Sequence, residues 1–372
     1  MAISAPSAVM LLVSPIEGTD RKGLTRAGIL ARLIEVEHNT PQGSFTPERA
    51  VNVIRVLSGT CIIAGLIAAC HKAPPADEHT AHMASADLSA PRPAASGTQG
   101  TAGIPASANT AQARVAASPR HGEWVKIPWE SGSSDSLMAW IVYPSTSRAK
   151  TPVVVVVHEI FGLQTWVRGV ADQVAADGFI AIAPDLISRV RGGPSTEELS
   201  GDSARKLIQG VSTAERNKGI AAAARYAMSQ ASAAPKYAVI GYCWGGSTVW
   251  AQAVNGGVNG FSGGVAYYGT PYMNGPQPIA DSLAKITKPV MLLNGSKDQR
   301  IAAAMPAIDS IMKALKKDYA ATNYDGAVHG FLRAQDDPKQ TRDEAEEKAN
   351  LAAAKDAWPK TIAFLKKNLG VK

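Results

Sequence analysis

The chain has 372 residues, of which 45% are hydrophobic and 19% are charged, and its formal net charge is +7. This composition is ordinary for a globular protein, and the length suits one large domain with an appendage, or two domains. No basic stripe interleaved with aromatic residues accompanies the modest positive charge, so we expect no nucleic-acid partner.

The N-terminal third is predicted to hold no catalytic machinery. Residues 1–50 show little pattern and are interpreted as a non-structured upstream segment, with the translation start expected near Val51. Residues 51–69 form an apolar run that resembles the central part of a signal peptide, too short and too rich in small residues for a transmembrane helix. The run ends in Ile67-Ala68-Ala69-Cys70, which resembles a bacterial lipobox with Cys70 as the lipidated residue. The alternatives are a short buried helix or a single anchor.

Residues 70–120 are rich in Ala, Pro, Ser, Thr and Gly without periodicity, which predicts a flexible tether. Together these features predict an exported, lipid-anchored protein on the periplasmic side or in the cell envelope, with a cytoplasmic location as the alternative. Signal removal would take away Cys61, and lipidation would block Cys70. Cys243 would then be the one remaining thiol, without a disulfide partner. Neither paired cysteines nor clustered histidines suggest a metal, so no metal or other cofactor is expected.

Strand and helix patterns alternate through residues 121–372, which we interpret as the catalytic domain. In the run 152–157, Pro152 is followed by five β-branched valines, as in a strand buried on both faces. The alternation predicts an α/β fold with a mainly parallel sheet and helices on both faces. Strands are expected at 123–128, 137–143, 152–157, 179–183, 237–240, 265–268, 289–295 and 320–324, and helices at 166–176, 197–209, 214–228, 305–317 and 356–369.

The most informative motif is Gly241-Tyr242-Cys243-Trp244-Gly245-Gly246, which follows a predicted strand and precedes a helix-compatible stretch. It has the form of the nucleophile elbow of an α/β-hydrolase, with cysteine in place of serine. Only glycine fits beside so tight a turn, and the backbone N–H of Trp244 would point at an oxyanion formed above Cys243. The alternative is a buried cysteine in a glycine-rich turn.

An acid and a histidine follow the elbow in the chain order of this fold. Asp298 lies where a loop leaves the carboxyl end of the strand at 289–295, the edge at which α/β sites form. His329 is the only histidine after Cys243, and it sits in a glycine-flanked turn. We therefore predict His329 as general base and Asp298 as its partner; less favourably placed rival acids are Asp281, Asp309 and Asp325.

Glu159 follows the buried strand at 152–157, at the edge where Cys243 is expected to emerge. Position alone leaves a functional and a surface role equally open. Neighbouring residues after a strand tend to point in different directions, so His158 is predicted to be structural.

These motifs together resemble the dienelactone hydrolase family (carboxymethylenebutenolidase-like), over residues 123–369. The segments that carry the resemblance are Glu159-Ile160-Phe161-Gly162, Pro184-Asp185-Leu186, the elbow, Asp298 and His329-Gly330-Phe331. The resemblance implies a triad of Cys243, His329 and Asp298, with Glu159 in contact with the resting thiol. It also implies an oxyanion hole made by the amides of Ile160 and Trp244, and a substrate carboxylate held by Arg333. A second substrate arginine is expected among Arg189, Arg191, Arg205 and Arg216.

The resemblance implies hydrolysis of a small ester or lactone through a thioester on Cys243. Some of these substrates are expected to carry a carboxylate. Glu159 would oppose ionisation of the thiol until a substrate displaces the carboxylate. A monomer is expected, and export points to a substrate outside the family's cytoplasmic aromatic catabolism. The alternatives are a redox-sensing or a non-catalytic lipoprotein on a hydrolase scaffold; redox sensing by Cys243 would need neither Asp298 nor His329.

Overall fold

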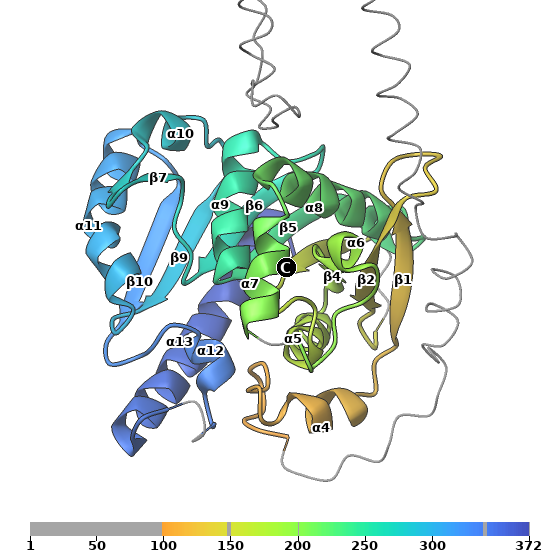
Figure 1. The fold of residues 1–372 in the computed structure, drawn as a ribbon, viewed down its shortest axis with the longest axis horizontal. Helices are drawn as coiled ribbons and strands as arrows, with labels where there is room; N and C mark the ends of the chain where they lie inside the picture. Colours follow the sequence, from red (N-terminus) through yellow and green to blue (C-terminus); the bar gives the residue numbers. More distant parts are fainter. Residues whose placement is uncertain (1–98, 147–149, 200, 338–340, 372) are drawn as a thin grey trace, which may run out of the picture. The chain divides into compact units, whose positions relative to one another are not determined.

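The computed structural model describes residues 99–371 apart from 147–149, 200 and 338–340 (Figure 1). The predicted upstream segment, the signal-like run, Cys70 and the tether as far as residue 98 lie outside the described residues. Within the described part of the chain, no helix has the length and apolar character that a membrane crossing needs.

An eight-stranded sheet forms the centre of the described chain, in the order β1-β2-β4-β3-β5-β6-β9-β10 (Figure 1). β2 is antiparallel to both of its neighbours, β1 and β4. The remaining strands of the sheet, β4, β3, β5, β6, β9 and β10, are parallel to one another. The strands are β1 Gly122–Pro128, β2 Ser136–Val142, β3 Thr151–Val157, β4 Ile180–Pro184, β5 Ala233–Tyr242, β6 Phe261–Tyr267, β9 Val290–Gly295 and β10 Tyr319–Tyr324; β7 Met273–Asn274 and β8 Gln277–Pro278 form a separate hairpin.

Helices cover both faces of the sheet, which confirms the predicted fold class. The connection from β3 to β4 contains α5, and the connection from β4 to β5 contains α8. These two connections run in opposite directions across the sheet. Because such crossovers are right-handed, α5 and α8 lie on opposite faces. Trp358 of α13 donates to Asp177 after α5 (2.9 Å), so α13 shares the face of α5. The helices are α4 Ala111–Ala116, α5 Thr165–Ala176, α6 Ser188–Arg191, α7 Gly201–Gln209, α8 Thr213–Met228, α9 Trp244–Asn255, α10 Ala280–Ala284, α11 Gln299–Ala314, α12 Phe331–Ala334 and α13 Glu344–Leu369.

The central strands carry continuous apolar runs because both of their faces are covered. The valines at 153–157 of β3 are fully buried, as are Val239 and Ile240 of the neighbouring β5. The carboxyl ends of β3, β5, β9 and β10 lie at one edge of this sheet, since these strands are parallel. That edge brings together the loops that carry Glu159, Cys243, Asp298 and His329.

Residues 99–120 are not a flexible tether, so this part of the prediction was wrong. They pack on the catalytic domain and include α4, with Ile104, Ala106, Ala111 and Val115 buried. Small apolar side chains fit closely against α5: a Cβ atom added at Gly169 would lie 3.5 Å from Val115 Cγ2. An alanine-rich stretch gives a weak hydrophobic pattern, although it packs well once a neighbouring helix is present.

Candidate active site

The loop between β5 and α9 is a tight turn with Cys243 at its apex. Cys243 has φ 55° and ψ −114°, a strained conformation for a residue with a side chain. A Cβ atom added at Gly241 would lie 2.3 Å from Gly245 O, and one added at Gly245 would lie 2.4 Å from Val157 O. These distances leave no space for a side chain, so the two glycines allow the elbow to press against the end of β3.

Asp298 and His329 meet at the same edge of the sheet. His329 Nδ1 lies 2.5 Å from Asp298 Oδ2, and no other carboxylate of the described residues hydrogen-bonds this ring. The other carboxylate oxygen, Oδ1, accepts the N–H of Ile301 (3.4 Å), so Asp298 is the N-cap of α11. The helix N-terminus therefore holds the carboxylate in position for the histidine.

Cys243 lies close enough to His329 to raise the pKa of the ring, so the sulfur is beside the histidine and its acid partner. Partial burial lowers the pKa of His329, but the hydrogen bond to Asp298 and the nearby Cys243 outweigh burial and raise it to about 10. The ring is 39% exposed, so solvent reaches the side that faces away from Asp298. The environment thus favours an imidazolium beside the sulfur.

Glu159 pairs with Arg333 rather than with the thiol. The Glu159 carboxylate is buried, and its Oε2 lies 2.8 Å from Arg333 Nε. The Nε–H is poorly aligned and makes no hydrogen bond to a described residue, so the contact is mainly one between charges. No hydrogen bond joins Glu159 to Cys243 among the described residues, since the carboxylate lies against the guanidinium of Arg333 in α12. The expected contact of Glu159 with the resting thiol stays a prediction.

His158 has a structural role, as predicted. Its Nε2 accepts the N–H of Leu186 (3.0 Å), so the proton lies on Nδ1, which donates to Glu159 O (2.6 Å). Burial lowers the pKa of His158, which keeps the ring neutral. The imidazole stacks on Trp244 with 5.4 Å between ring centroids, so it supports the residue after the nucleophile.

Asp185, in the Pro-Asp-Leu motif, is also structural. Its two carboxylate oxygens accept the N–H (2.6 Å) and the hydroxyl (2.9 Å) of Ser195. Burial raises the pKa of this carboxyl. The carboxylate closes the loop that leads from β4 past α6, and it does not reach the sulfur.

The two predicted oxyanion donors flank the elbow. Trp244 is the first residue of α9, so its N–H has no acceptor within the helix. Ile160 follows Glu159 in the turn after β3. Since Gly245 packs against the carbonyl oxygens of Val157 and His158, the end of β3 and the elbow are in direct contact.

Sequence reasoning missed a tyrosine that contacts the candidate base. Tyr268 directly follows β6 with φ 38°, and its ring centroid lies 4.9 Å from that of His329. Burial, and then the charge on Glu159, raise the pKa of its hydroxyl well above the usual value. This hydroxyl has no hydrogen-bond partner among the described residues. A tyrosine at the end of an apolar strand resembles any core aromatic, so the sequence held no signal for it.

The four candidate second arginines lie in different surroundings. Arg189 pairs with Asp135 and covers Trp129, Arg191 hydrogen-bonds Pro194 O, and Arg205 pairs with Asp202 on the surface. Arg216 instead donates to Thr248 Oγ1 (2.8 Å) and lies 5.1 Å above the ring of Trp244. It has no carboxylate partner among the described residues, and burial lowers its pKa. Arg216 is therefore the member of this set next to Trp244 and the elbow.

No group of metal-ligating side chains occurs among the described residues. The family model for the dienelactone hydrolase family matches residues 137–369. A protein of Escherichia coli (strain K12) named "Putative carboxymethylenebutenolidase" is 26% identical over 245 residues, 64% of this chain and 85% of that protein. A Bradyrhizobium protein named "Probable 2-oxo-3-(5-oxofuran-2-ylidene)propanoate lactonase" is 28% identical over 255 residues, 66% of this chain and 94% of that protein.

The fold also resembles a crystal structure described as "Putative Dienelactone Hydrolase" from Klebsiella pneumoniae, with a TM-score of 0.53 and 23% identity. That likeness covers 66% of this chain and 98% of the other. The family model spans more than half of the chain. The chain belongs to the dienelactone hydrolase family and is an ester or lactone hydrolase of that family.

Proposed function

We propose that the protein hydrolyses a small ester or lactone through a thioester formed on Cys243. One observation carries the proposal: Cys243, at the strained elbow, lies beside His329, whose Nδ1 contacts Asp298. The names of the E. coli and Bradyrhizobium relatives, a carboxymethylenebutenolidase and a lactonase, support the substrate class.

The first half of the reaction acylates the cysteine. A protonated His329 beside the sulfur favours the thiolate, which forms a bond to the substrate carbonyl carbon. The N–H groups of Ile160 and Trp244 would donate to the oxyanion of the tetrahedral intermediate. When the intermediate collapses, the bond to the leaving oxygen breaks and the imidazolium gives that oxygen its proton.

The second half uses the neutral His329 as a base. It removes a proton from water, the water oxygen attacks the thioester carbonyl, and cleavage of the carbon–sulfur bond returns the thiolate. Asp298 orients the ring through Nδ1, so that the other ring nitrogen faces the reaction. These positions support the proposed roles of Cys243 as nucleophile, His329 as acid–base group and the two amides as oxyanion donors.

Arg333 and Glu159 suggest a preference for substrates that carry a carboxylate. A guanidinium binds a carboxylate through two parallel hydrogen bonds, and an incoming carboxylate would compete with Glu159 for Arg333. Release of Glu159 from Arg333 would then change the charge beside the elbow. Arg216, which lacks a carboxylate partner among the described residues, is the candidate second cation for an anionic substrate.

The direct test is a search for the thioester. Rapid acid quenching during turnover of a 4-nitrophenyl ester should give an intact mass increased by the acyl group, and Cys243→Ala should show neither the adduct nor turnover. Cys243→Ser should retain a small fraction of the activity at most. Near-normal turnover by Cys243→Ala would contradict covalent catalysis at this residue.

The redox alternative gives a different pattern. A thiol that only senses oxidants needs no histidine–acid pair, so His329→Gln would leave peroxide oxidation of Cys243 intact. Under this alternative, neither the parent protein nor His329→Gln would hydrolyse an ester. We expect the reverse: ester hydrolysis by the parent protein and its loss in His329→Gln.

A further inference from the structure

Residues 99–121 precede the region that matches the family model, yet they are attached to both sides of the site. Trp166, in the first turn of α5, donates its indole N–H to Ala106 O (3.0 Å). On the other side, Ala108 N donates to Arg333 O (2.9 Å), and Gln335 Nε2 donates to Pro105 O (2.7 Å). The segment thus connects the helix that follows the Glu159 loop with the short helix that follows His329.

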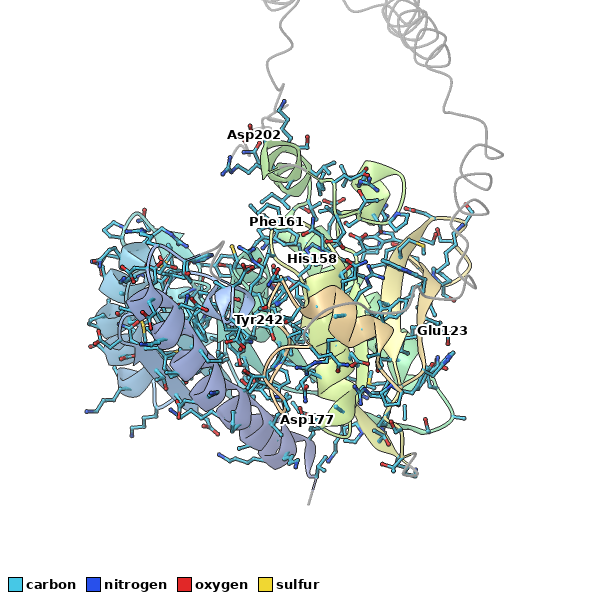
Figure 2. All side chains as sticks on the ribbon, turned by 90° about the horizontal axis from the view of Figure 1, so that it is seen from below. Glu123, His158, Phe161, Asp177, Asp202 and Tyr242 are labelled. Carbon is cyan, nitrogen blue, oxygen red and sulfur yellow. The ribbon has the colours of Figure 1, made fainter. Side chains whose placement is uncertain are left out.

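Further contacts hold this segment, here called the lead-in segment (residues 99–121), against the domain. Arg120 makes a two-point contact with the buried Asp172 of α5, at 3.0 and 2.6 Å. Thr101 Oγ1 donates to Asp336 Oδ2 (2.8 Å) directly after α12. In Figure 1, α4 lies beside α5 near α12, and Figure 2 shows Phe161 and Asp177 near opposite ends of α5. The α4 helix is therefore a fixed part of the domain.

A cavity of about 130 Å³ lies between the lead-in segment and the site. Glu159, Phe161 and Arg333 line it from the site, and Ala108 and Gln112 line it from the lead-in segment. Because a water molecule occupies about 30 Å³, the cavity has room for a substituent of about four non-hydrogen atoms. Because Arg333 and Gln112 line the same cavity, a substrate held by Arg333 would place such a group near Gln112.

The charges around this cavity are already compensated. Arg333 pairs with Glu159, and Glu197 lies 3.8 Å from the guanidinium of Arg168 and accepts the N–H and the hydroxyl of Thr165, each at 2.6 Å. Gln112, in contrast, is exposed and makes no hydrogen bond to a described residue. Its side-chain amide can both donate and accept. The lining thus fits an uncharged polar group better than a second charge.

We propose that the lead-in segment completes the substrate site: it forms the outer wall of a subsite for an uncharged, hydrogen-bonding substituent, with Gln112 as the residue that selects it. This inference rests on the proposed ester hydrolysis and adds a specificity element outside the family-matched region. The two sides of the cavity would bind different substrate groups: Arg333 a charged group and Gln112 a neutral one.

The test compares 4-nitrophenyl acetate, butanoate and methoxyacetate, because the last two have the same shape and differ by one ether oxygen. A second series places the same groups on the alcohol side of the ester. Gln112→Leu removes the amide, Gln112→Trp fills the cavity, and Ala117→Trp is the control at an exposed residue of the same segment outside the cavity lining. Unchanged thermal unfolding shows that each variant is folded.

We divide kcat/KM for the ether-containing ester by kcat/KM for the alkyl ester of the same shape. In one of the two series, Gln112→Leu should lower this ratio about fivefold, which is the effect of one neutral hydrogen bond. Gln112→Trp should lower kcat/KM for both longer esters about tenfold relative to acetate. Ala117→Trp should change neither ratio by more than about twofold. Unchanged ratios in both series would overturn the subsite. Absence of hydrolysis by the parent protein would instead overturn the proposed function.

Discussion

At the scale of single residues, Asp298 combines two contacts that fix the geometry of the site. One carboxylate oxygen caps α11 through the N–H of Ile301, and the other contacts His329 Nδ1. The rival acids do not have this combination: Asp325, for example, accepts a hydroxyl from Ser296. The position of the histidine is thus set by a helix N-terminus rather than by a flexible loop.

We predict that Asp298→Asn lowers the pKa of His329 from its raised value of about 10. Asparagine preserves the helix cap, so the change reports on the lost negative charge. NMR titration of the ring gives the pKa directly, and Asp325→Asn is the matched control. A pKa that stays near 10 in Asp298→Asn would show that Cys243 alone maintains the protonated ring.

The same variant has a consequence for stability. Because the folded-state pKa of His329 lies above its ordinary 6.5, protonation stabilises the fold fully below about pH 6.5, and this stabilisation is lost as pH rises through about 10. Denaturant unfolding at pH 6 and pH 10 should therefore show a smaller pH effect in Asp298→Asn than in the parent protein.

Arg333 gives a second prediction at this scale. Arg333→Ala should lower kcat/KM for an ester that carries a carboxylate at least about tenfold more than for its neutral amide analogue, because a charged hydrogen-bonded contact is lost. Arg205→Ala is the control, since Arg205 is exposed and pairs with Asp202 on the surface. Equal losses for both substrates would mean that Arg333 serves only to balance the charge of Glu159.

At the scale of elements, the parallel strands and the elbow were predictable because their patterns are continuous. The valines of β3 predict a strand buried on both faces, as observed. Glycine is required at 241 and 245 because an added Cβ atom would lie less than 2.5 Å from a backbone oxygen. The order of nucleophile, acid and histidine then identified the residues that the fold brings to one edge. Each of these signals lies within a short stretch of sequence.

Helix starts were predicted less well. The expected starts at 305 and 356 place Pro306 and Pro359 in a first turn, where proline is favoured. In the structure both prolines lie inside helices, which begin after the capping residues Asp298 and Asp343. The contact of Glu159 with Arg333 and the docking of α4 depend on residues far apart in sequence, so no local pattern revealed them.

The packing of α4 on α5 gives the prediction for this scale. Gly169→Ala should be tolerated and should stabilise the protein by up to about 1 kcal/mol, because the added Cβ meets Val115 and Ala111 at ordinary contact distances while alanine favours the helix. Gly169→Leu should displace α4, so limited proteolysis should cleave the lead-in segment faster. Equal cleavage rates in both variants would contradict close packing at this position.

At the scale of the whole molecule, the lead-in segment determines where the preceding chain joins the domain. Gln99, the first described residue, accepts a hydrogen bond from Arg114 of α4 through its carbonyl oxygen (2.7 Å). The described chain therefore begins against α4, the helix that carries Gln112. Any attachment upstream of residue 99 is linked covalently to the domain through the lead-in segment.

We predict that this attachment is a lipid on Cys70, which lies outside the described residues. Ile67-Ala68-Ala69-Cys70 resembles a lipobox and follows an apolar run that begins after Arg55. Buried acyl chains contribute about 0.8 kcal/mol per CH₂, and stable anchoring needs more than one chain, as a lipidated N-terminal cysteine would provide. Mass spectrometry of detergent-extracted protein should find a mature chain that begins at acylated Cys70. Cys70→Ala should move the protein out of the membrane fraction, whereas the control Cys61→Ala should not. A Cys70→Ala protein that still fractionates with membranes would contradict the lipid anchor.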